Sequence, residues 1–243
     1  MKSVLLILHV LSALSQLLFF GVLGQKMRQV LIQCWAKRLL RILKIKIVVH
    51  GDRHLLNSKT GFLMVSNHVS WLDIHVINSV MPITFVAKSD VANWPIFGWI
   101  AKNIGTIFIK REKISDLKRV IHLMQSRLSA GEAICIFPEG TSSDGVSVLD
   151  FRSNLFESVA QTQQKILPIA IQYQEHNRYS NRAAFIGEMG LIDSIKQIMQ
   201  SDYLEAHIHL LDPLESHSSR QNLAERSRQA ILATKLFDDY NQD

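Results

Sequence analysis

The sequence is poor in the residues on which several common classes of protein depend. It has two cysteines, Cys34 and Cys135, and no Cys-x-x-Cys pair, which excludes a disulfide framework and cysteine-ligated zinc or redox sites. Only 11 Gly and 5 Pro occur among 243 residues, and 47% of the residues are hydrophobic. A collagen-like or largely disordered chain is therefore excluded. This length and composition fit one α/β domain with a small addition.

Acidic residues are missing from positions 1–50. That stretch holds eight Lys and Arg residues and no Asp or Glu, so it carries +8, whereas the remaining 19 basic and 21 acidic residues sum to −2. The net charge of +6 taken alone would favour a nucleic-acid partner. Because the excess belongs to one N-terminal segment, we expect no nucleic acid as a partner.

The first part of that segment, residues 4–23, is an apolar run in which His9 is the one ionisable side chain. As a helix it would be about 30 Å long, which is the thickness of a bilayer's hydrocarbon core. Three interpretations compete: a cleaved signal peptide, a spanning helix, and a helix anchored in one leaflet. Polar residues at helical spacing favour the third, because they form a stripe: His9, Ser12, Ser15 and Gln16.

A second helix is predicted over residues 25–43. One face is basic, and another is apolar and includes Trp35, a pattern typical of an interfacial helix on anionic lipid. The alternative is an ordinary surface helix with solvated charges. We expect residues 1–44 to form a membrane-anchoring helix pair and residues 45–243 to form a separate catalytic domain.

The remaining chain alternates short β runs with helical segments, which predicts an α/β fold with a mixed, largely buried β-sheet flanked by helices. The expected strands are 45–50, 61–66, 84–87, 106–109, 133–137, 166–173 and 206–211. A helix is expected directly after His68, and further helices are expected at 115–130, 154–163, 191–200 and 219–237.

The sharpest chemical feature is the stretch Asn67–Asp73, at a predicted strand-to-helix turn. A carboxylate five positions after His68 can fold back to one imidazole nitrogen and leave the other free as a base. On spacing alone, a helix cap beside a solvated acid is the competing interpretation. Ser70 lacks the Gly-x-Ser-x-Gly context of a nucleophile. His68, Asp73 and His75 do not match a known metal spacing.

Two further stretches can bind an anion. Residues 137–145 run from an apolar strand into a Pro-Glu-Gly-Thr loop, whose amides suit phosphate or a hydroxyl-rich headgroup. Residues 105–111 form a half-buried strand that ends in Arg111, whose guanidinium can bind phosphate in a bidentate manner. A plain turn and a solvated strand end are the alternatives.

Taken in order, these stretches resemble the lysophospholipid acyltransferase family, above all the bacterial 1-acyl-glycerol-3-phosphate acyltransferases. The matching blocks are "NHVSWLD", "GTIFIKR", "FPEGT" and "ILPIAI", and the similarity covers residues 45 to about 215. Four ordered blocks are far more specific than any one of them. They also make the His68–Asp73 dyad much the stronger interpretation.

The resemblance implies a role for each matching position. His68 would be the general base that deprotonates the hydroxyl of 1-acyl-sn-glycerol-3-phosphate, with Asp73 orienting it. The hydroxyl would attack the thioester of acyl-CoA or acyl-ACP directly, without an acyl-enzyme, to give phosphatidic acid. Arg111 would bind phosphate. The implied supporting residues are Asn67 at the turn, Lys88 as a further phosphate ligand, and the loop Glu139, Gly140 and Thr141.

The resemblance also implies an environment and an ambiguity. It implies no metal or organic cofactor, membrane lipid as a partner, and a place on the cytoplasmic side of the inner membrane. Ser142 stands where the family usually has Arg after Pro-Glu-Gly-Thr, and "EGTSSDG" is closer to a branch that includes lyso-ornithine lipid acyltransferases. We expect lysophosphatidate as the acceptor first and lyso-ornithine lipid second. A non-catalytic, membrane-anchored lipid-binding protein is the alternative from another class.

Overall fold

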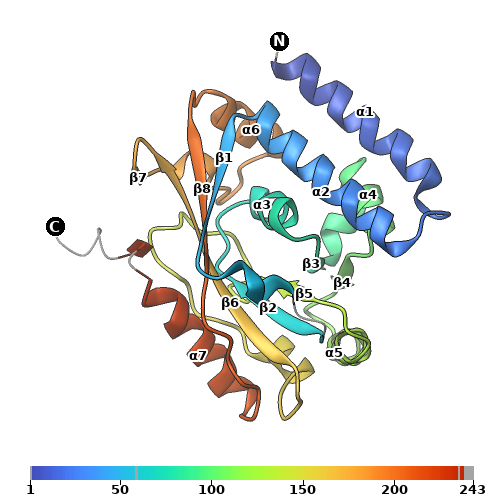
Figure 1. The fold of residues 1–243 in the computed structure, drawn as a ribbon, viewed down its shortest axis with the longest axis vertical. Coiled ribbons are helices and arrows are strands. Elements are labelled where there is room, and N and C mark those ends of the chain that lie inside the picture. The colour runs from blue at the N-terminus through green and yellow to red at the C-terminus, as the bar shows by residue number, and fades with distance from the viewer. Residues whose placement is uncertain (1, 58–59, 235, 238–243) are drawn as a thin grey trace.

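A computed structural model describes residues 2–57, 60–234 and 236–237 (Figure 1). Its α-helices are α1 Lys2–Phe20, α2 Gln25–Ile42, α3 Leu72–Val80, α4 Phe97–Asn103, α5 Ile114–Ser129, α6 Leu191–Met199 and α7 Arg220–Leu232. Its strands are β1 Ile45–His50, β2 Phe62–Ser66, β3 Thr84–Lys88, β4 Ile107–Ile109, β5 Ile134–Ile136, β6 Lys165–Glu175, β7 Arg178–Tyr179 and β8 Leu204–Leu210.

The strands form one mixed sheet in the order β1-β8-β6-β2-β5-β3-β4, with β7 paired to β6. The strands from β6 to β4 are parallel to their neighbours along this path. β8 is antiparallel to β6, and β1 is parallel to β8. The strand β1 therefore runs opposite to β2, and the register places its last residue, His50, level with Ala170, one position beyond the partner of Ser66.

Both faces of the sheet are buried, as the apolar strands predicted. Along β2, Phe62 and Met64 pack on the face covered by α2 and α3, whereas Leu63 and Val65 pack on the face covered by α5. This alternation follows from the two-residue period of a strand. The α7 helix closes the second face beside β6 through Ile231 and Ala170.

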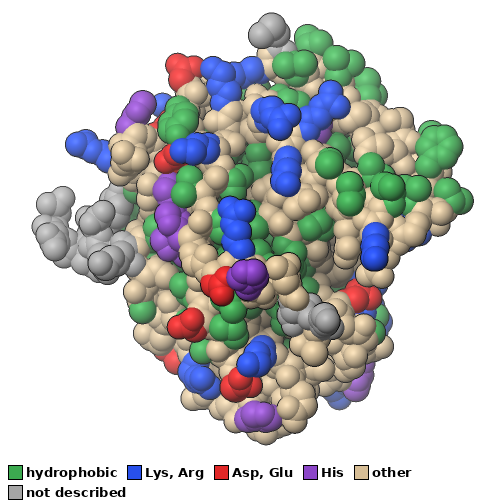
Figure 2. Space-filling model, viewed as in Figure 1, with side chains coloured by type: hydrophobic (Ala, Val, Ile, Leu, Met, Phe, Trp, Pro, Cys, Tyr) green, Lys and Arg blue, Asp and Glu red, His purple; other side chains and the backbone are tan. Residues whose placement is uncertain are grey.

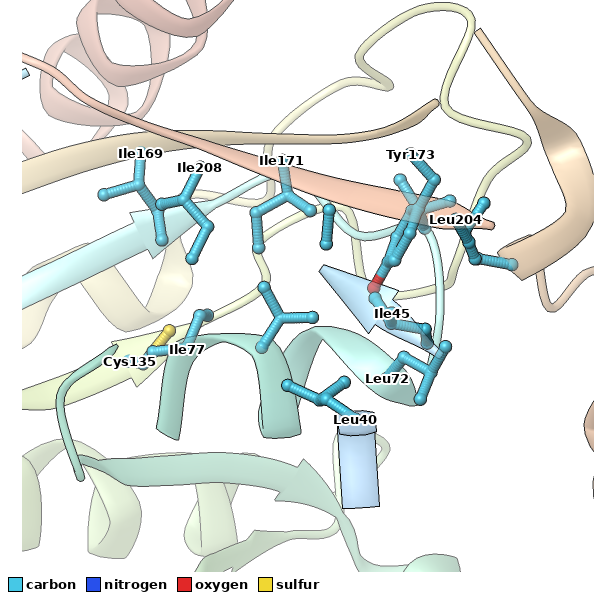
Figure 3. Close-up of a cluster of buried hydrophobic side chains, with 14 of the residues drawn as sticks. Leu40, Ile45, Leu72, Ile77, Cys135, Ile169, Ile171, Tyr173, Leu204 and Ile208 are labelled. Atoms are coloured by element: carbon cyan, nitrogen blue, oxygen red, sulfur yellow. The ribbon is translucent and has the colours of Figure 1, made fainter. Parts of the chain in front are cut away.

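The core between the sheet and α3 joins residues that are far apart in the sequence (Figure 3). Figure 3 shows Tyr173 reaching from the sheet toward the helix layer, among Leu72, Ile45 and Leu204. Tyr173 is 1% exposed and Leu72 is fully buried. Burial of this much apolar area is the main stabilising contribution to the fold, at about 25 cal/mol per Å².

The two N-terminal helices lie outermost, against α3 and α4. The α2 helix packs on α3 with Leu39 and Leu40 buried, while α1 packs on α2 and α4 through Ala13, Leu17 and Phe20. The outward face of α1 is apolar and exposed: Val4, Leu5, Ile7, Leu8, Leu11, Leu18 and Phe19. Figure 2 shows these green side chains along α1, with basic side chains gathered over α2.

Two predicted helices differ from the observed ones, and one observed helix was not predicted. Residues 154–163 were expected to form an α-helix, but a single 3-10 turn, Asn154–Ser158, is observed. The predicted closing helix 219–237 ends at Leu232. The α4 helix was not predicted, because its seven residues are too few to show a helical period and a proline, Pro95, lies two residues before its start.

Candidate active site

The predicted motif blocks converge at one edge of the sheet. Three of the four blocks, and Lys88, lie at the C-terminal ends of β2, β3, β4 and β5, which are neighbours in the strand order and run parallel. The fourth block, residues 166–171, lies within β6. Loops that follow the ends of parallel strands meet at the same edge, which is where α/β sheets commonly bind ligands. Segments from residues 67–73, 88, 111 and 137–142 are thereby brought together.

His68 and Asp73 form the predicted dyad. The imidazole Nδ1 of His68 lies 2.9 Å from Oδ2 of Asp73. The His68 ring stacks on Phe137, with centroids 4.1 Å apart, and its side chain keeps 20% exposure. With Nδ1 bonded to a carboxylate, Nδ1 carries the proton and Nε2 is left with its lone pair. This is the arrangement required of a general base.

Asp73 is held by four hydrogen bonds although it is fully buried. Besides His68, the backbone N–H groups of Val69 and Ser70 donate to Oδ2 at 2.7 and 3.0 Å. The hydroxyl of Tyr173 donates to Oδ1 at 2.7 Å. Burial, together with the neighbouring carboxylate, raises the pKa of Tyr173 well above its usual value, so this tyrosine stays a donor. A carboxylate can be buried only when its oxygens accept hydrogen bonds in this way.

Glu139 connects the Pro-Glu-Gly-Thr loop to the dyad rather than to the cavity. Its Oε1 accepts the backbone N–H of His68 at 2.7 Å, and its Oε2 accepts that of Leu149 at 3.3 Å. Burial raises the pKa of Glu139 to about 7, although these two N–H groups oppose the shift. The carboxyl group is 4% exposed. Glu139 therefore positions His68 and is not placed to touch a substrate.

Asn67 also differs from the role of a substrate ligand. Its amide donates to the carbonyl of Ile171 at 2.9 Å and accepts the N–H of the same residue at 2.7 Å. The side chain is fully buried. This paired bond ties the end of β2 to β6, which fixes the turn that carries His68. The expectation that Asn67 holds the turn agrees with this geometry, whereas contact with substrate does not.

Arg111 lies beside Gly140, as an anion site at this edge requires. A guanidinium nitrogen of Arg111 donates to the carbonyl of Gly140. Burial lowers the pKa of Arg111, and the neighbouring Arg152 lowers it further. Gly140 has φ of +79°, and a Cβ there would lie 3.0 Å from nitrogens of both arginines. Only glycine fits this position, because a side chain would be strained and would displace the cations.

Residues around the loop differ in how they can meet a ligand. The Ser142 hydroxyl donates to the carbonyl of Phe185, so it braces the loop. Thr141 is exposed and faces the cavity. Lys88 also lines the cavity, but its Nζ is paired with Asp90 at 2.6 Å. A ligand phosphate would have to compete with that carboxylate for Lys88.

A cavity of about 400 Å³ begins at His68 and continues beneath the N-terminal helices. Its polar end is formed by His68, Lys88, Arg111 and the loop 140–142. The rest is apolar and is lined by residues of α1, α2, α3 and α4, among them Leu17, Phe20, Leu31, Trp35, Ile74 and Ile100. The cavity can therefore place a polar headgroup near the dyad and an apolar chain toward the exposed helices.

Two residues of this site were not predicted from the sequence. Tyr173 lies two positions beyond the block at 166–171, on the same face of β6 as Ile171, so the strand period was a usable signal. Arg152 reaches Gly140 because its backbone N–H bonds to the carbonyl of Pro138 at 2.9 Å. No spacing rule marks it, because this contact depends on how the loop 140–152 folds back.

Comparison with known proteins identifies a family over a range of the chain that contains all four blocks. The sequence profile of the Acyltransferase family matches residues 46–172. The chain is 32% identical to the lyso-ornithine lipid O-acyltransferase of Pseudomonas aeruginosa, over 84% of this chain and 78% of that one. It is 29% identical to the 1-acyl-sn-glycerol-3-phosphate acyltransferase of Neisseria meningitidis, over 71% and 70%. The crystal structure of the 1-acyl-sn-glycerophosphate acyltransferase PlsC of Thermotoga maritima shares the fold, with a TM-score of 0.67, 21% identity, and coverage of 100% of this chain and 99% of that one.

Proposed function

The chain belongs to the Acyltransferase family, and from this premise we propose that it is a lysolipid O-acyltransferase that uses a His68–Asp73 general base. The observation that carries the proposal is the buried, fully satisfied Asp73 behind a His68 ring that opens on an apolar cavity. The donor would be an acyl thioester, either acyl-CoA or acyl-ACP. The acceptor would be the free hydroxyl of a lipid that already carries one acyl chain.

The reaction would proceed by direct transfer. His68 Nε2 takes the proton of the acceptor hydroxyl as its oxygen attacks the thioester carbonyl carbon. Asp73 stabilises the imidazolium that forms, because its carboxylate accepts a hydrogen bond from the protonated Nδ1. The tetrahedral intermediate then collapses, the C–S bond breaks, and the imidazolium returns its proton to the leaving thiolate. The products are an ester and a free thiol, and no acyl-enzyme forms.

The headgroup of the acceptor would bind near Arg111. A phosphate, as in 1-acyl-sn-glycerol-3-phosphate, fits a guanidinium beside a loop that contains glycine. The carboxylate of an ornithine headgroup fits the same pair of arginines. Ser142 provides no cation at a position where the family usually has an arginine, and its hydroxyl donates to the carbonyl of Phe185. Together with the relatives named for lyso-ornithine lipid, this favours the ornithine-type acceptor over lysophosphatidate.

The N-terminal helices would hold the enzyme on the cytoplasmic face of the inner membrane. The helix α1 is long and apolar enough to cross a bilayer. However, α1 packs along α2 and α4, and the buried His9 stacks on Trp35 of α2 with centroids 4.4 Å apart. These contacts favour a helix pair lying in one leaflet, with the exposed apolar face of α1 in the acyl chains and the basic residues of α2 at the anionic headgroups.

The decisive experiment offers purified protein both acceptors, lysophosphatidate and lyso-ornithine lipid, each with acyl-CoA and with acyl-ACP. We expect thiol release and a diacylated product with at least one pair, and none with His68→Ala. Product from lysophosphatidate alone would reject the ornithine-type acceptor. Lysolipid binding without any thioester consumption would instead support a non-catalytic lipid-binding protein.

A further inference from the structure

A cluster of three histidines lies outside the candidate active site. His50 is the last residue of β1, and His207 and His209 lie on the adjacent strand β8. The parallel register places His50 opposite His209, and His207 shares the face of His209 because the two are separated by one residue. Figure 2 shows histidine side chains gathered over this part of the sheet.

The ligand atoms of these three rings converge. One nitrogen from each ring lies within 4.8 Å of the other two. The closest pair is His50 Nε2 and His207 Nδ1, at 3.0 Å. Two nitrogens bound to one tetrahedral zinc ion at about 2.0–2.1 Å are roughly 3.3 Å apart. A shift of an ångström or so at His209 would therefore bring all three atoms to coordinating distance.

A hydrogen bond between two of the rings leaves one polar atom unexplained. That bond accounts for His50 and His207, but the buried Nε2 of His209 has no hydrogen-bond partner within residues 2–57, 60–234 and 236–237. A buried ring nitrogen without a partner is costly. A shared metal ion would satisfy all three rings at once.

The surroundings of His207 favour a metal ligand. Its second nitrogen, Nε2, lies 3.2 Å from Oε2 of Glu205, so this nitrogen carries the proton and Nδ1 keeps its lone pair for the cluster. A carboxylate on the far nitrogen of a histidine ligand is the usual second layer of a zinc site. Glu205 is held in turn by Lys46, at 2.8 Å.

We propose that His50, His207 and His209 bind a divalent transition metal of the zinc class, and that this ion clamps β1 to β8. Three neutral imidazoles suit zinc, copper or nickel rather than magnesium or calcium. The site is structural rather than catalytic, because β8 and β6 lie between β1 and β2. His207 and His209 also alternate along β8 with core residues that face α3, so their rings lie on the other face of the sheet. The clamp would hold the strand that directly follows the anchoring helix α2.

The test uses the full-length chain in detergent, without a polyhistidine tag, after treatment with a chelator. Zn²⁺ is titrated against a competing indicator, Co²⁺ is added to read its ligand-field spectrum, and the melting temperature is measured with and without Zn²⁺. We expect one Zn²⁺ per chain, a tetrahedral Co²⁺ spectrum, and a higher melting temperature with metal. Acyl transfer below the melting temperature should be the same with and without the ion.

Three variants locate the site. His50→Gln and His209→Gln should each weaken Zn²⁺ binding at least tenfold and remove the metal-dependent rise in melting temperature. Glu205→Gln should weaken binding about 10–100-fold, because the ligand itself remains. His122→Gln, a control on an exposed histidine of α5, should bind like the parent. Parent-like Zn²⁺ binding by His209→Gln, or a parent melting temperature that does not change with Zn²⁺, would overturn the proposal. Acyl transfer by each variant reports whether that variant is folded.

Discussion

The His68–Asp73 dyad and the N-terminal helices adjoin the same cavity but are held in different ways. Asp73 is fully buried and accepts four hydrogen bonds. Glu139 accepts two more, from the backbone N–H groups of His68 and Leu149. The α1 helix instead rests on apolar side chains, and its outer face is exposed and apolar. The hydrogen bonds hold the dyad in one geometry, as proton transfer requires. The α1 helix can instead adjust its position to the lipid and still cover the cavity.

The largest effect on turnover is expected from a substitution at His68. His68→Ala removes the base but none of the bonds that Asp73 makes to Val69, Ser70 and Tyr173. We expect turnover to fall about 10²–10⁴-fold, as for loss of a general base, with little change in thermal stability. Product formation under single-turnover conditions measures the effect, and His122→Ala serves as the control. Retention of full turnover would refute the proposed mechanism.

Glu139 should make the stability of the folded protein depend on pH. Its pKa is raised to about 7 in the folded state, so the folded protein binds more protons than the unfolded chain between about pH 4.5 and 7. Stability from this group is therefore lost as the pH rises through that window, on the order of 3 kcal/mol. Glu139→Gln removes this loss because the amide does not ionise.

The measurement is unfolding of the parent and Glu139→Gln at pH 5 and pH 8. The stability difference between the two should move in favour of Glu139→Gln at the higher pH. A difference that is the same at both pH values would show that burial does not perturb this carboxyl group.

The contribution of α1 to membrane binding is tested on the exposed face of the helix. Leu18 and Phe19 are 75% and 66% exposed, so replacing both with Ser should leave the fold intact. We expect binding to anionic vesicles to weaken about tenfold or more, since burying one such side chain contributes about 1.5–3 kcal/mol. Turnover of detergent-dispersed substrate should not change.

The matched control is Ile114→Ser on α5, which is 74% exposed but lies away from α1 and α2 (Figure 1). Equal loss of vesicle binding in the control and the double variant would contradict an orientation set by α1.

The smallest effect is expected at Tyr173. Tyr173→Phe removes one of the four donors to Asp73 while keeping the ring in the core. We expect a stability loss of about 1.5 kcal/mol, as for a bond to a charged group. The turnover number should fall only a few-fold, with the KM for thioester unchanged, because the bonds to Oδ2 still orient the carboxylate. A KM effect as large as the turnover effect would mean that Tyr173 shapes the substrate cavity instead.

Local patterns predicted most of the elements, and the four ordered blocks made the dyad the stronger interpretation of its stretch. The strands at 45–50 and 61–66 and the helix after His68 follow from hydrophobic period and turn signals, and the structure confirms them. The helix expected at 154–163 was wrong, because packing of Phe156 into the core does not need a helical period. Asn67 was expected to hold the turn, but only the pairing of β2 with β6 shows how: its amide bonds to the backbone of Ile171.

The sequence by itself determined what lies within one turn of chain: the spacing that lets Asp73 reach His68, and the segregation of basic and apolar residues before position 50. The tertiary structure decided every contact that depends on strand order. It set Tyr173 on Asp73 and the histidines of β1 and β8 together, while the folding back of the loop 140–152 set Arg152 beside Gly140. The physical reason is that a short loop restricts geometry to a few conformations, whereas residues 100 or more positions apart meet only through the sheet that pairs them.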